Sequence, residues 1–116
     1  MAVLPHVLSV GKDAILVSSR TLLLSNAGYA VQEAYSLDKA ATLVELDSIV
    51  LTLLCHTVPP GEKQVLISLV QKKKPLTPIV CIRSYAHESF PRNCTAVDND
   101  PEALLGCLKS MVRVNQ

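Results

Sequence analysis

Short apolar runs in the chain alternate with longer stretches in which apolar residues recur at helical spacing. Residues 7–10, Val-Leu-Ser-Val, predict a first β-strand, which ends at Gly11. A helix is predicted next, because Asp13 stands where an N-cap belongs and apolar residues recur every three or four positions after it. Gly28 supplies the usual stop at the C-terminus of a helix. The chain therefore begins with a strand followed by a helix.

The same order then repeats. Residues 29–34 alternate well enough for a second strand, and Ser36 is a suitable N-cap for a helix that runs through Leu46. Residues 49–55 are almost continuously apolar, which is typical of a strand covered by helices on both faces. This run is the best candidate for the central strand of a sheet.

A third helix and a fourth strand follow. Residues 59–61, Pro-Pro-Gly, break the chain, and an apolar stripe over residues 65–70 then indicates a helix. The helix ends at three consecutive lysines, residues 72–74. Because cations complement the dipole at a helix C-terminus, we interpret these lysines as a helix end rather than a nucleic-acid site. Residues 78–82 predict a buried fourth strand.

The apolar pattern weakens over residues 83–93, where a full helix is not expected. Residues 94–97 predict a brief fifth strand, and Asp100 is the N-cap of a final helix. Alternating strands and helices indicate a parallel sheet with helices on both faces. In such a sheet, ligands bind outside the C-terminal ends of the strands.

Composition narrows the class of protein. The 116 residues suffice for one domain over 1–116, and 49% hydrophobic against 18% charged residues supply a core. With a net charge of +1, the chain lacks the strongly positive potential on which sequence-independent nucleic-acid binding depends. The apolar runs are too short to cross a bilayer, and the first residues lack the pattern of a secretory signal. We therefore expect a cytoplasmic protein with neither nucleic-acid nor membrane partners.

The four cysteines lie at wide, irregular spacings that suggest neither a zinc site nor a disulfide framework. We interpret Cys55, Cys81, Cys94 and Cys107 first as small buried hydrophobic residues. A nucleophile pair of Cys55 and His56 is disfavoured, because adjacent side chains of an extended strand point to opposite faces. No catalytic residue and no cofactor are predicted, so the chain is not expected to be an enzyme.

The whole chain resembles the receiver domain of bacterial response regulators, which act in two-component phosphorelay signalling. The resemblance is carried, in order, by residues 7–13, 26–29, 50–60 and 100–105. It implies a flavodoxin-like α/β fold, a doubly wound five-stranded parallel sheet with strand order 2-1-3-4-5. This fold agrees with the order of elements above, with the fourth helix shortened or lost.

The resemblance also implies which residues replace the phosphorylation groups of the family. Receivers accept a phosphoryl group on an Asp at the end of the third strand, where this chain has Cys55. The acidic pair that holds Mg²⁺ in receivers corresponds to Gly11 and Lys12. The switch Ser or Thr corresponds to Arg83, with Ser84 one residue later. The resemblance therefore implies a receiver-like domain that has lost Asp phosphorylation and binds no metal.

Three functions stay open at this point. The leading one is a stand-alone signalling domain that works by contact with a protein partner, a second copy of the chain being one candidate. The length leaves no room for an effector domain. The segment for the fourth helix is roughly eight residues too short, so the partner face must differ from that of other receivers.

The second function is a sensor, in which Lys12 and Arg83 form a cationic pocket beside Cys55. Such a pocket binds a small anion, or it lowers the pKa of the Cys55 thiol enough to make it redox-responsive. The third is an ordinary phosphorylatable receiver whose acceptor lies elsewhere in the chain.

Overall fold

The computed structural model describes residues 4–85, 87–91 and 94–112. The strands are β1 (His6–Val10), β2 (Ala30–Ala34), β3 (Ile49–Leu54), β4 (Ile79–Ile82) and β5 (Cys94–Val97). The helices are α1 (Ala14–Asn26), α2 (Leu37–Val44), α3 (Pro60–Lys73) and α4 (Pro101–Met111). In the described part of the chain, no helix combines the length and the apolar character that a membrane crossing needs.

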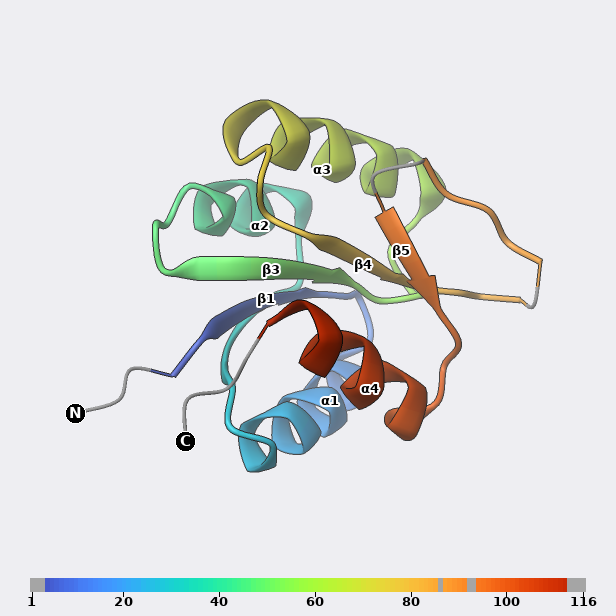
Figure 1. The fold of residues 1–116 in the computed structure, drawn as a ribbon. Coiled ribbons are helices and arrows are strands. Elements are labelled where there is room, and N and C mark those ends of the chain that lie inside the picture. The colour runs from blue at the N-terminus through green and yellow to red at the C-terminus, as the bar shows by residue number, and fades with distance from the viewer. Residues whose placement is uncertain (1–3, 86, 92–93, 113–116) are drawn as a thin grey trace.

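All five strands are parallel and form one sheet in the order β2-β1-β3-β4-β5, which confirms the predicted fold class. Helices α2 and α3 cover one face of the sheet, and α1 and α4 cover the other (Figure 1). Val10, at the end of β1, pairs with Ala34 of β2 and Leu54 of β3. Because these strands end at the same level, the loops that follow them gather at one edge of the sheet.

The two faces of the sheet enclose separate apolar cores, and successive strand residues enter them alternately. Leu53 packs with residues of α1 and α4, whereas Leu54 packs with residues of α2 and α3. Val7 and Leu8 of β1 divide in the same way. The interpretation of the third strand as buried on both faces is therefore confirmed, although β3 ends at Leu54 rather than at residue 55 and its Val50 is exposed.

The predicted signals at the helix ends are present. The Asp13 carboxylate accepts hydrogen bonds from two backbone N–H groups of α1, at 3.0 and 3.2 Å. Ser36 and Asp100 cap α2 and α4 in the same manner. Gly28 follows α1 with a φ of 101°, a left-handed conformation that favours glycine.

The structure departs from the predicted boundaries at two helices. The Pro-Pro-Gly segment does not interrupt the chain before α3, since α3 begins at Pro60. Proline is tolerated at the first helical position because its missing N–H has no partner there. Helix α2 ends at Val44 rather than at Leu46. Between β4 and β5 the described residues include no helix. This agrees with the prediction that the helix which joins these two strands in receivers is shortened or lost, and α4 is the predicted final helix.

Candidate functional site

The residues predicted to replace phosphorylation groups lie at the C-terminal edge of the sheet. Gly11 and Lys12 follow β1, Cys55 follows β3 and Arg83 follows β4. The Cys55 N–H donates to the Val10 carbonyl at 2.8 Å. A Cβ added to Gly11 would lie 3.3 Å from the Cys55 Sγ, so the Gly11 backbone lies directly against this cysteine.

The Cys55 side chain is enclosed. It is 0% exposed, and its Sγ lies 3.9 Å from the Ser9 Oγ. Burial raises the pKa of the Cys55 thiol and outweighs the lowering effects of Arg20, Ser9 and Lys63. Lys12 and Arg83, the cations predicted to lower this pKa, are not among the groups that act on it, so the redox hypothesis gains no support, and the burial favours a packing role for Cys55.

The remaining cysteines differ in burial. All four thiols are free, and Cys81 is buried like Cys55, whereas Cys94 and Cys107 are half-buried. Burial, reinforced by the neighbouring Cys94, raises the pKa of Cys81 to about 12. The interpretation as buried hydrophobic residues thus holds fully for Cys55 and Cys81 only.

Lys12 and Arg83, the two cations predicted to flank Cys55, each have a carboxylate partner. The Lys12 Nζ lies 3.0 Å from Glu62, and the Arg83 Nη1 lies 3.1 Å from Asp98. Both side chains are partly exposed, at 41% and 30%. Their charges are compensated within the chain, so the hypothesis of an anion pocket built from these two cations gains no support.

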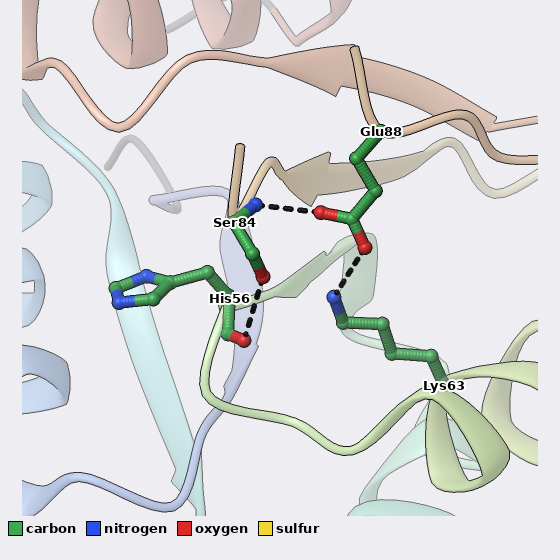
Figure 2. Close-up of polar contacts among 4 residues, drawn as sticks. All are labelled: His56, Lys63, Ser84 and Glu88. Carbon is green, nitrogen blue, oxygen red and sulfur yellow. Dashed lines mark hydrogen bonds and ion pairs between the residues drawn. The ribbon is translucent and has the colours of Figure 1, made fainter. Parts of the chain in front are cut away.

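Another lysine at this edge, Lys63, is buried, unlike Lys12, and takes part in a polar network (Figure 2). The Lys63 Nζ lies 3.4 Å from the Glu88 Oε2 and 5.2 Å from the centre of the Phe90 ring. The Glu88 Oε1 accepts from the Ser84 N–H at 2.6 Å, and the Ser84 Oγ donates to the His56 carbonyl at 3.2 Å. The network fastens the segment after β4 to α3 and to the loop after β3.

The electrostatics of the network favour ionised Glu88. Burial raises the pKa of Glu88, but the hydrogen bond from the Ser84 N–H and the charge of Lys63 outweigh it and hold the pKa below its ordinary value. Ser84, the alternative to Arg83 at the switch position, is exposed and has both its N–H and its hydroxyl in hydrogen bonds.

Arg20 is a further functional candidate, which our sequence prediction did not include. It comes from α1, is 7% exposed, and donates from Nη2 to the Asn99 Oδ1 at 2.8 Å. The same Nη2 lies 3.3 Å from the His56 Nδ1. Burial lowers the pKa of His56, and the charge of Arg20 lowers it further. Arg20 thus brings together the loops that follow β3 and β5.

The sequence does contain a signal for Arg20. It lies three residues after Val17 and four before Leu24, and both of these are fully buried. An arginine at this spacing belongs to the buried stripe of its helix and needs polar partners there. The disfavoured pairing of Cys55 with His56 is not among the hydrogen bonds of the described residues, since these residues contact Ser9 and Arg20 instead.

Comparison with solved structures shows that the arrangement is the fold of response regulator receiver domains. A CheY-like receiver domain protein from Methanospirillum hungatei superposes with a TM-score of 0.81 at 22% identity, covering 93% of each chain. The receiver domain of a sensor histidine kinase from Pseudomonas aeruginosa gives 0.79 at 14% identity, over 94% of this chain and 98% of that one. That structure has a magnesium ion coordinated in its active site cleft.

A complex of a histidine kinase with a response regulator protein also contains a similar chain, with a TM-score of 0.80 at 16% identity. The match covers 94% of this chain and 99% of that one. At these identities the similarity establishes the fold. No protein-family model matches the sequence, and no curated protein matches it.

The side chains at this edge do not fit a magnesium ion. Mg²⁺ requires octahedral oxygen ligands, usually including one or two carboxylates. Here Gly11 offers no side chain, Lys12 brings a positive charge, and the Cys55 thiol is buried with a raised pKa. The nearby carboxylates of Asp13 and Glu62 are engaged with the start of α1 and with Lys12.

Proposed function

We propose that this chain is a receiver-like domain of two-component signalling that acts by contact with another protein. It is not phosphorylated on an Asp and catalyses no reaction of its own. We place it in the bacterial cytoplasm. The proposal combines the receiver fold with an edge whose chemistry differs from that of a phosphorylatable receiver.

The observation that carries the proposal is the position and burial of Cys55. It directly follows β3, the strand whose end carries the phosphoacceptor in receivers, and it is 0% exposed. A thiol cannot form the acyl phosphate that an Asp forms. Lys12, which follows Gly11 after β1, is bound to Glu62 and provides no carboxylate for a metal.

Contact with a protein is supported by the surface of α1. Ile15 and Leu22 are 78% and 64% exposed, and they lie seven residues apart, which places them on the same side of the helix. Large apolar side chains that gather on one helix face are typical of contact surfaces. The partner is a signalling protein, or a second copy of this chain.

Phosphorylation is tested by incubating the protein with acetyl phosphate and Mg²⁺ and measuring its intact mass. We expect no added phosphate, while a receiver domain with an intact acidic pair is modified in the same mixture. A single phosphate-sized adduct that is lost at alkaline pH would contradict the proposal. It would support the alternative of an ordinary receiver with a displaced acceptor.

The contact mode is tested by affinity capture from cells with an Ile15→Ser/Leu22→Ser double variant. We expect this variant to lose partners that the unchanged chain and a Val65→Ser variant retain. Val65 is a suitable control because it is 52% exposed on α3, away from the α1 surface. Equal capture by all three proteins would exclude this face. Sedimentation of the same three proteins tests whether the partner is a second copy.

A further inference from the structure

Arg20 differs from the other cations at the C-terminal edge because it takes part in no ion pair of the described residues. Lys12, Lys63 and Arg83 have carboxylate partners at 3.0, 3.4 and 3.1 Å. Arg20 bonds the neutral groups of Asn99 and His56 and lies near the Cys55 thiol, although it is 7% exposed. Its Nη1 is enclosed and has no hydrogen-bond partner among the described residues.

An uncompensated charge in this position is unusual. Moving a guanidinium out of water is costly, and buried charges are normally paired with an opposite charge. A buried arginine without an anion therefore points to an anion that arrives from outside the chain.

A cavity of about 150 Å³ lies next to Arg20, between α1 and the start of α4. Arg20 and Asn99, which are joined by the hydrogen bond from the Arg20 Nη2, both line it. The apolar part of the wall consists of Leu16, Leu23, Ile82, Pro101 and Leu104. A cavity of this volume accommodates a molecule about the size of benzene.

The other charged groups around the cavity are already engaged within the chain, so the Arg20 charge can still pair with one negative group. Asp98 and Asp100 also line it, but Asp98 is bound to Arg83, and Asp100 accepts from the Ala103 N–H as the cap of α4. The positive end of the α4 dipole adds to the charge of Arg20 on this side.

We propose that this cavity binds a small organic carboxylate with a compact apolar body. The carboxylate pairs with the Arg20 guanidinium, and the body packs between Leu16, Leu23 and Leu104. The apolar wall favours an organic acid over an inorganic anion, because phosphate would lose its hydration against leucine side chains without recovering it. This binding site adjoins the position considered above, since Arg20 acts on the Cys55 thiol and Asp98 of the wall is bound to Arg83, but neither Cys55 nor Lys12 lines the cavity.

The test is an amide NMR titration of the complete chain with benzoate at constant ionic strength. We expect saturable shifts at the residues that line the cavity, and none with benzamide, the neutral molecule of the same shape, or with inorganic phosphate. An absence of saturation with benzoate, or an equal response to benzamide or phosphate, would overturn the proposal.

Two pairs of variants place the site. Arg20→Met is expected to weaken benzoate binding at least tenfold, whereas Lys39→Met, which removes an exposed cation of α2 on the other face of the sheet, is not. Ser19→Tyr obstructs the exposed rim of the cavity without changing the core, and Ser18→Tyr is its control because Ser18 does not line the cavity. The serine pair also decides the question if Arg20→Met fails to fold. Benzoate binding that survives Ser19→Tyr would refute the assigned position.

Discussion

Lys63 and Glu88 form the most enclosed ion pair of the described residues, with side chains 5% and 14% exposed and 3.4 Å between their charged atoms. Lys63 lies in the first turn of α3, and Glu88 lies in the segment that leads from β4 to β5. The pair therefore fastens a segment without a described helix to the body of the domain.

Replacing Glu88 by Gln is expected to destabilise the fold by on the order of 3 kcal/mol, because it leaves the buried Lys63 ammonium without a counter-charge. Lys63→Met should cost less, since the remaining Glu88 can turn toward water. The double variant should recover part of the loss. Urea denaturation of the four proteins measures these differences, and strictly additive effects would contradict the coupling.

Gly11→Ala is expected to destabilise the fold by about 1–3 kcal/mol through overpacking. The added Cβ would lie 2.7 Å from the Val17 Cγ2 and 3.1 Å from the Cys55 Cβ. Gly106→Ala is the matched control: nothing lies within 4 Å of its added Cβ, and Gly106 is inside α4. That variant should gain about 0.5–1 kcal/mol from helix propensity. Thermal unfolding of both variants checks the opposite signs, and a stabilising Gly11→Ala would contradict the close approach.

The four thiols should react in an order set by burial. We expect Cys94 and Cys107, which are half-buried, to be alkylated first in the native protein. Cys55 and Cys81 should react only on unfolding, because burial raises their pKa values and shields them. Timed alkylation with iodoacetamide followed by peptide mapping measures the order. Early labelling of Cys55 would revive its interpretation as a redox sensor.

His56 should titrate below its ordinary pKa of 6.5, since burial and then the charge of Arg20 disfavour its protonated form. The unfolded chain then binds a proton at a higher pH than the folded chain does. The stability contributed by neutral His56 is present above pH 6.5 and is lost as the pH falls through the lower, folded-state pKa.

In Arg20→Met the pKa of His56 should rise toward its ordinary value, and the acid-induced loss of stability should shrink. Lys39→Met should leave the titration unchanged, because this exposed lysine lies on the other face of the sheet and is not among the charges that act on His56. An NMR titration of the imidazole signals measures both. A His56 pKa that is the same in the Arg20→Met variant would show that the guanidinium does not act on it.

Much of the fold could be predicted because its signals are local. Asp13, Ser36 and Asp100 are caps that act on neighbouring N–H groups, so their positions determine where three helices begin. The continuous apolar run of β3 likewise reflects its burial on both faces. The start of α3 was missed because a proline, which usually interrupts a helix, also suits its first position.

The candidate site was predictable only in part. The resemblance to receivers placed Cys55 at the end of the third strand, but the charge state of its surroundings depends on distant partners. Lys12 pairs with Glu62, fifty residues away in the chain, and no local pattern predicts that contact. The role of Arg20 depends on how α1 is rotated against the sheet. This rotation brings the Arg20 guanidinium to Asn99, which lies 79 residues later in the chain.

The segment between β4 and β5, whose described residues include no helix, has a consequence for local unfolding. Strand β5 is four residues long, pairs only with β4, and lies at the edge of the sheet. Its amide hydrogens should exchange with solvent through partial openings that leave β1 and β3 intact, while the central strands exchange only when the whole domain unfolds. In such a domain, β5 can detach from the edge of the sheet and re-form there while the core of the domain stays folded.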